Sequence, residues 1–274
     1  MRRLLLLFLI ACCCAVPPAS ADDDVVLRAM SDEMARAVRD LRLENLPRPY
    51  YMDCTALESD TFSGVAVFGG LARSERFRSR SGYVNVRVGS YQLDNTNFVA
   101  GAFARSGYDA EPLPLEDDYL VLRRHFWLPA DEAYKGAVEA LARKQAALQH
   151  IRLSTQLNDF ARQEPVESLE PRGRLSLDKK AWEQRLREFS ALFRRYPLIQ
   201  SSRVELEAAA GTTWFVNSEG TRVRDPDEIY LLQAFASTQA PDGMRLWDAV
   251  SIAARRAELL GGAAEIRAQI EAMA

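Results

Sequence analysis

Apolar residues in the first part of the chain recur at two different spacings. Between residues 25 and 43 they return every three or four positions, which predicts an amphipathic helix that Pro47 and Pro49 end. Three apolar-rich runs follow, at 50–57, 62–72 and 83–93, and they predict strands. In the third run apolar and polar residues alternate, as in a sheet that has one solvent-facing side.

A polar stretch at 94–114 separates these strands from the next elements. We interpret it as a long loop, because glycines and prolines interrupt it. Helical spacing then returns, and 134–151 is predicted to form a long amphipathic helix with Arg143 and Lys144 on its solvent-facing side. A polar connector follows at 158–177.

The order of helix, strands and helix is repeated after the connector. Asp178 is placed to cap a helix over 179–196. Strand-like runs then occupy 202–210, 212–217, 229–238 and 244–252, and a last helix is predicted over 258–273. The repetition indicates either a structural duplication or an order of elements that is common in α+β proteins.

The predicted fold class is α+β, with antiparallel sheets, flanking helices and two similar halves. The first segment covers 22–157, the connector 158–177 and the second segment 178–274. A single extended sheet with helices on one face is one way to join the two segments into one domain.

The composition is that of an ordinary globular protein. The chain has 274 residues, of which 48% are apolar and 27% charged, and its formal net charge is −3. These values exclude a collagen-like or low-complexity chain. The mild acidity argues against nucleic-acid binding, which usually relies on a surplus of basic side chains.

The amino terminus has the features of a bacterial secretory signal peptide. A short basic start precedes an apolar run at 4–16, and an Ala-x-Ala site predicts cleavage between Ala21 and Asp22. The run is too short to span a bilayer, which takes about 20 helical residues. We therefore expect removal of residues 1–21 and a periplasmic or secreted protein. A lipobox-like sequence ending at Cys12 leaves a lipoprotein anchored through that cysteine as the alternative.

Cleavage would change both the charge and the cysteine count. The remaining chain has 33 basic and 38 acidic residues, a net charge of −5, and Cys54 as its one cysteine. An intramolecular disulfide is then excluded, so we expect packing to hold the core together. Cys54 is predicted to be a small buried residue.

Few residues are available for metal or nucleophile chemistry. His125 and His150 are 25 positions apart, whereas a His-Glu-x-x-His site needs two imidazoles one helical turn apart. The sequence contains no nucleophile elbow, phosphate-binding loop or Cys-x-x-Cys pair. The acidic clusters at 22–24 and 116–118 precede helices, where capping explains them. We assign no catalytic residue, no metal ligand and no cofactor to this chain.

Two polar groups of residues remain as candidates for binding. The arginines at 73, 76, 78 and 80 are predicted to form ion pairs within the sheet, with an anionic partner as the alternative. The second group is Arg87, Tyr91, Asn95 and Asn97, at and after the third predicted strand. Polar amides at the start of a long loop can contact a peptide or a partner, although Asx-type turns also explain them.

An ordered set of segments resembles exported bacterial members of the TldD/PmbA family. The segments lie at 40–46, 49–51, 86–91, 93–98, 116–119, 142–146, 215–220 and 237–244, and include Phe215-Val216-Asn217-Ser218-Glu219-Gly220. The resemblance that these segments carry extends over nearly all of the chain that follows the predicted signal peptide. The resemblance implies an amino-terminal α+β domain of a protein linked to peptide maturation and to modulation of DNA gyrase.

The same resemblance places the zinc chemistry of the family outside this chain. Active members are zinc peptidases that use a His-Glu-x-x-x-His motif and a later cysteine, and other members are non-catalytic partner subunits. This sequence lacks that motif, so no family zinc ligand can be assigned to any of its positions.

Two functions are therefore expected from the sequence. The first is a non-catalytic module that helps to form a peptide-binding cleft or pairs with a TldD/PmbA-type catalytic subunit or with itself. An open strand edge at 84–91 would hold the extended peptide. The second is a stand-alone periplasmic scaffold that associates through the helix at 134–151.

Overall fold

The computed structural model describes residues 24–98, 110–149 and 157–274. The predicted cleavage site between Ala21 and Asp22 and the lipobox cysteine Cys12 lie outside these ranges, as does His150. None of the helices within the described ranges is long and apolar enough to cross a bilayer.

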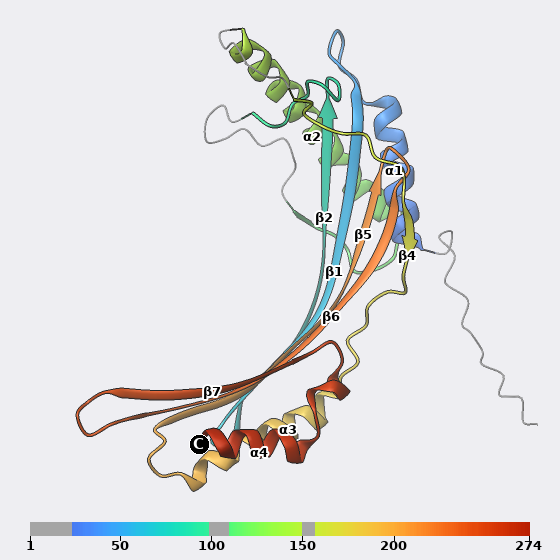
Figure 1. Ribbon diagram of the computed structural model, residues 1–274. Coiled ribbons are helices and arrows are strands. Elements are labelled where there is room, and N and C mark those ends of the chain that lie inside the picture. The colour runs from blue at the N-terminus through green and yellow to red at the C-terminus, as the bar shows by residue number, and fades with distance from the viewer. Residues whose placement is uncertain (1–23, 99–109, 150–156) are drawn as a thin grey trace, which may run out of the picture.

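A single seven-stranded sheet runs through the molecule (Figure 1). Its four long strands are β1 (Pro49–Val67), β2 (Gly70–Val88), β5 (Ser201–Asn217) and β6 (Arg222–Gln239), and neighbours pair antiparallel in the order β2-β1-β5-β6. Three shorter strands complete it: β3 (Glu111–Pro112) on β2, and β4 (Glu167–Leu169) and β7 (Arg245–Ala254) on β6. The α+β class is confirmed, and the pairing of β1 with β5 joins both sequence segments in one sheet.

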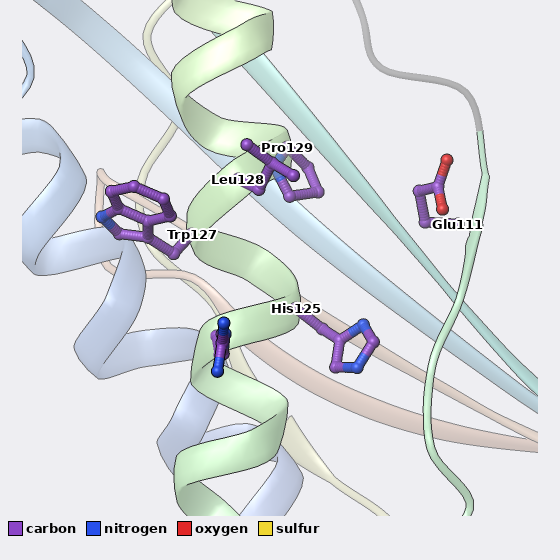
Figure 2. A pocket seen from close by; sticks show the side chains of 6 residues that line it. Glu111, His125, Trp127, Leu128 and Pro129 are labelled. Atoms are coloured by element: carbon purple, nitrogen blue, oxygen red, sulfur yellow. The ribbon is translucent and has the colours of Figure 1, made fainter.

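Helices cover the two ends of this sheet in pairs. The helices α1 (Val25–Asp40) and α2 (Tyr119–Leu148) lie against one end, and α3 (Lys179–Ala191) and α4 (Ala263–Met273) against the other (Figure 1). Short 3-10 turns occupy Leu192–Arg195 and Ala257–Leu260. Pro129 lies inside α2, close to His125 and Trp127 (Figure 2).

Both helix pairs pack on the face formed by even-numbered strand residues. Met52 and Cys54 of β1 contact the α1–α2 end, and Phe62 and Ala66 of the same strand contact the α3–α4 end. The opposite, odd-numbered face of the sheet carries no helix from the described part of the chain. The arrangement that the sequence allowed, one sheet with helices on one face, is therefore the one found.

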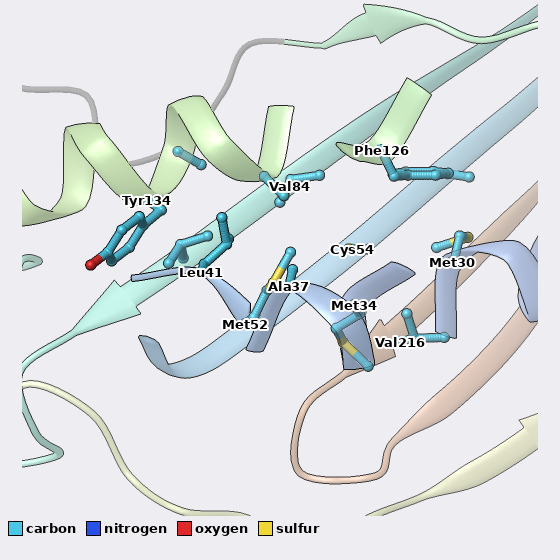
Figure 3. Packing of buried hydrophobic residues seen from close by; sticks show 14 of the residues in the cluster. Met30, Met34, Ala37, Leu41, Met52, Cys54, Val84, Phe126, Tyr134 and Val216 are labelled. Atoms are coloured by element: carbon cyan, nitrogen blue, oxygen red, sulfur yellow. The ribbon is translucent and has the colours of Figure 1, made fainter. Parts of the chain in front are cut away.

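Two separate hydrophobic cores result. The upper core combines α1, α2 and strand residues such as Val84 and Val216 (Figure 3). The lower core gathers Trp182, Leu186 and Phe189 of α3 around β5 and β6. Each core includes strand residues from both sequence segments. The two cores therefore lie at opposite ends of the same strands and do not correspond to the two segments. The segment boundary at 158–177 stays a prediction, and part of that connector forms β4.

The strands are longer than their apolar runs predicted. Residues 58–61 look like a polar break in the sequence, but they continue β1, because Glu58 and Asp60 pair with arginines of β2. Gly211 does not end β5 either. The connector crosses the sheet there: a Cβ built on Gly173 would lie 2.1 Å from the carbonyl oxygen of Gly211. Glycine in a strand often marks such a close approach of two backbones.

Candidate functional site

The four polar residues predicted to bind a peptide or partner lie together where β2 ends. Arg87 is the last residue but one of that strand. Tyr91, Asn95 and Asn97 follow in the loop that folds back beside it. Gly89 permits the reversal, since its φ of +106° is unfavourable for other residues. A bridge between Gly89 and Asp94 closes the turn.

A buried carboxylate, Asp94, organises this cluster. It accepts hydrogen bonds from Arg87 Nη1 at 2.9 Å and from the Tyr50 hydroxyl at 2.7 Å, and Arg87 also donates to Thr96 Oγ1 at 2.8 Å. Burial alone would raise the pKa of Asp94, but the hydrogen bonds from Thr96, Tyr50 and Arg87 outweigh it and lower that pKa. Burial and the hydrogen bond to Asp94 raise the pKa of Tyr50, so the pair is a neutral phenol beside a carboxylate.

Asn95 is a structural residue of the sheet edge. Its side chain is buried, its Oδ1 accepts from the Val88 amide at 2.8 Å, and its Nδ2 donates to the Val86 carbonyl at 3.3 Å. It therefore occupies the groups on β2 that an added strand would use. β3 pairs with Ser81 and Gly82 on the same strand. The edge at 84–91 is thus less open than the sequence suggested, and strand addition at Val86–Val88 would first have to displace Asn95.

Lys144 is buried against this loop, not on the solvent-facing side of its helix as predicted. Its ammonium group donates to the Thr96 carbonyl oxygen at 2.6 Å and pairs with Asp159, and only 4% of the residue is exposed. Asp159 also accepts from the Asp94 amide at 2.8 Å, and its carbonyl oxygen accepts from Asn97 Nδ2 at 2.8 Å. The prediction was wrong because helical periodicity only shows which residues share a face of the helix. It does not show that a loop packs on the polar face and buries Lys144.

Aromatic rings complete the cluster. The Tyr91 ring lies edge-on to Tyr50 at 4.9 Å and parallel to Phe160 at 6.0 Å, and the Tyr91 hydroxyl donates to Glu219. The Arg87 guanidinium lies 4.0 Å from the centre of the Phe160 ring. The hydrogen bond to Glu219 raises the pKa of Tyr91. Arg87, Tyr91, Asn95 and Asn97 all have internal partners, so the visible role of the cluster is to fix the loop, and contact with a peptide stays a prediction.

Several members of this cluster were not among the residues predicted from the sequence. Tyr50, Asp94 and Lys144 come from three elements, and Asp159 and Glu219 from the connector and the β5–β6 turn. Asp94 was detectable as a neighbour of the two asparagines. The others were not, because they are distant in sequence and only the sheet order brings them together.

The histidine of α2 faces a shallow cavity of about 280 Å³. Figure 2 shows His125 on the side of the helix that faces Glu111, and Trp127 on another side. One imidazole and one nearby carboxylate fall short of the three or four protein ligands of a zinc site. No group of three His, Cys, Asp or Glu residues in the described ranges is placed to hold a metal ion.

The basic stretch of β2 forms ion pairs within the sheet, as predicted. Arg76 pairs with Asp60 at 2.7 Å, and Arg78 and Arg80 pair with Glu58. Cys54 is fully buried in the upper core, and burial raises its thiol pKa. It has the packing role that was predicted for it.

The helix-free face of the sheet presents a mixed apolar and small polar surface. One row across it runs Tyr83, Thr55, Phe215 and Val223, all partly exposed. Leu57, on the next row of this face, is 37% exposed. Phe77 and Ile229, at the two ends of the row through Thr61 and Ala209, are 66% and 51% exposed. We call the four residues of the first row, together with Leu57, Phe77 and Ile229, the open face. Exposed apolar patches of this kind mark surfaces that bind other proteins.

Two solved structures share this architecture. One, from Thermotoga maritima, aligns over 90% of this chain with a TM-score of 0.52 and 12% identity, and the other, from Bacteroides thetaiotaomicron, over 89% with 0.54 and 9%. Each is described as a "putative modulator" of DNA gyrase. The chain has the fold of these two proteins. That fold agrees with the TldD/PmbA resemblance of the sequence, and at such low identity it is the fold alone that is shared.

The similarity covers part of each of these proteins. The chain spans 47% of the Thermotoga maritima protein and 49% of the Bacteroides thetaiotaomicron protein, about half their length. TldE from Thermococcus kodakarensis aligns with a TM-score of 0.49, which is too low to support an inference. No protein-family model and no curated protein matches the sequence.

Proposed function

We propose that this chain is an exported, non-catalytic TldD/PmbA-like module that pairs with a second subunit through its open face and so forms one wall of a peptide-binding cleft. The observation that carries the proposal is that face: all described helices lie on one side of the sheet, and the other side exposes Leu57, Phe77 and Ile229. The fold shared with the two proteins described as a "putative modulator" of DNA gyrase supports it.

The surface chemistry fits a partner that binds reversibly. On the open face Thr55 lies between the partly exposed rings of Tyr83 and Phe215, and interfaces between separately folded proteins have this mixed apolar and polar character. Four long strands hold the face rigid, so little ordering cost would accompany binding. The simplest partner is a second copy of this chain, and a catalytic subunit of related fold would use the same surface.

A dimerisation experiment tests the proposal. Sedimentation velocity of the purified mature protein over a hundredfold range of concentration should show a monomer–dimer equilibrium. Leu57→Arg and Ile229→Arg each place a charge on the open face and should shift the protein to monomer. A protein that stays monomeric throughout, or an unaffected dimer in both variants, would overturn it.

The second function, a scaffold that associates through its long helix, is favoured by one observation. Leu120, Trp127 and Leu128 of α2 are 71%, 48% and 49% exposed. These side chains lie before the predicted stretch at 134–151, of which α2 includes residues up to Leu148. Leu128→Arg is therefore the matched control: loss of the dimer in this variant alone would favour the helix over the open face.

Export is tested separately. Amino-terminal sequencing of the protein from a periplasmic fraction should begin at Asp22. A start at Cys12 carrying a lipid would establish the lipoprotein alternative, and a cytoplasmic protein that keeps Met1 would contradict export.

A further inference from the structure

A charged region divides the two hydrophobic cores. It lies on the helix side of the sheet, between the two helix pairs, and encloses a cavity of about 330 Å³. We call it the waist. Its ionic side chains are Glu58 and Asp60 of β1, Arg76, Arg78 and Arg80 of β2, Asp117 before α2, and Arg172 and Arg174 of the connector.

The connector is fixed across the sheet at this point. The amide of Gly173 donates to Thr212 Oγ1 at 2.9 Å, and the missing side chain lets Gly173 lie against the backbone of Gly211. Two positions further on, the Leu175 carbonyl oxygen accepts from Arg76. Arg172 and Arg174 flank the anchored glycine, so both side chains line the cavity.

The positive charges at the waist outnumber the negative ones, five arginines to three carboxylates. Arg172 also pairs with Asp24, which Arg224 shares, and with these two residues included six arginines face four carboxylates. Asp60 is bound by Arg76, and Glu58 is shared by Arg78 and Arg80. The third carboxylate, Asp117, is also shared by two arginines, Arg80 and Arg172.

Two groups at the waist keep hydrogen-bond donors available. Arg174 makes neither an ion pair nor a hydrogen bond with any residue that the structure describes. The hydroxyl oxygen of Thr212 accepts from Gly173, which leaves its own hydrogen to donate, and the residue is only 4% exposed. The cavity thus combines the guanidinium of Arg174, a half-exposed Arg78 and a buried hydroxyl donor.

We propose that the waist binds a small oxyanion, a phosphate or a carboxylate group, through Arg174, Arg78 and Thr212. Guanidinium groups donate two parallel hydrogen bonds to the paired oxygens of such groups. Binding would supply the missing negative charge without breaking the ion pairs of Glu58 and Asp60. The cavity is within the size range of small-molecule sites and, like many of them, lies between two packed units. The inference does not depend on the pairing function proposed above.

Calorimetric titration of the mature protein with inorganic phosphate, and separately with acetate, at constant ionic strength set with chloride, tests the proposal. At least one of the two anions should bind saturably, and the one that binds identifies the group as phosphoryl or carboxylate. Arg174→Gln should weaken that binding about tenfold or more, because a charge-assisted pair is lost. Arg255→Gln, an exposed arginine outside the cavity, is the matched control and should bind like the wild type.

Each outcome decides the proposal. Arg174 has no described partner, so Arg174→Gln should melt at the wild-type temperature. Thr212→Ser keeps both the hydroxyl donor and the acceptor of the Gly173 amide and should bind like the wild type, whereas Thr212→Val should lose affinity. Absence of saturable binding for both anions would overturn the site. Equal affinity in wild type and Arg174→Gln, or an equal loss in Arg255→Gln, would overturn it too, since only non-specific screening would then remain.

Discussion

Asp24 connects the start of α1 to the sheet, and its replacement by asparagine has a calculable cost. Its carboxylate caps the helix by accepting from the amides of Val26 and Leu27. It also accepts from Trp214 Nε1 at 2.9 Å, from Arg224 Nη1 at 2.7 Å and from Arg172 Nη2 at 3.0 Å. Asparagine keeps a capping oxygen but removes the charge. Arg224 is 2% exposed, so Asp24→Asn leaves a buried cation unpaired, which costs about 3–5 kcal/mol of unfolding free energy.

The pH dependence of this cost follows from the pKa of Asp24. Burial alone would raise that pKa, but the hydrogen bonds from Trp214 and Arg224 lower it from 3.8 to about 2. A carboxyl whose pKa is lower in the folded state stabilises the protein above its unfolded pKa, and this stabilisation is lost as the pH falls towards the folded pKa. The difference between wild type and Asp24→Asn should therefore shrink by about 1 kcal/mol between about pH 5 and about pH 3.

Urea unfolding followed by tryptophan fluorescence measures both effects. Asp178→Asn is the matched control, because Asp178 caps α3 by accepting from Ala181 alone and is exposed. It should cost no more than about 1 kcal/mol. Equal costs for Asp24→Asn and Asp178→Asn, or a difference that does not change with pH, would refute the assignment of the stabilisation to the buried charge pair.

Three further predictions concern the glycine crossing, the cysteine and the metal. Gly173→Ala should lower the unfolding free energy by about 2 kcal/mol or more, because its Cβ would meet the Gly211 carbonyl oxygen. Gly262→Ala, with open space around it, should be nearly neutral, and urea unfolding of the two variants compares them. Cys54 should not react with a thiol reagent in the folded protein and should react fully in urea, and rapid labelling of native protein would contradict its burial. Mass spectrometry of metals should find far less than one zinc per purified chain, with no peptidase activity after zinc is added. Stoichiometric zinc bound through His125 would contradict our assignment of no metal ligand, which within the described ranges rests on the lack of a suitable group of side chains.

Local signals made much of the fold predictable. Asp178 caps its helix as the sequence indicated, and the helical spacing of Trp182, Leu186 and Phe189 identified the residues that fill the lower core. These features depend on neighbours within a few positions. Nothing at that range shows that β1 continues through Glu58 and Asp60, because the arginines that pair with these carboxylates belong to the next strand.

The candidate site was predictable in its location and less so in its chemistry. The asparagines at 95 and 97 were recognisable as candidates from the sequence, and they do lie in a polar cluster. Lys144 and Asp159 reach it from a helix and a connector whose positions depend on the packing of the whole sheet. Sequence spacing predicts which residues share a face of a helix or strand. A contact between elements that are distant in the sequence can be predicted only if their packing is known.

The four long strands have a mechanical consequence. β1 has 19 residues, which at about 3.3 Å per residue is a continuous rod of about 60 Å that passes through both cores and the waist. No loop between the two ends can act as a joint, so bending or twisting imposed at one end travels along the same hydrogen-bonded ladder to the other. Between the cores this ladder passes through a layer of ion pairs, where charged side chains can re-pair without opening the void that displaced apolar side chains would leave.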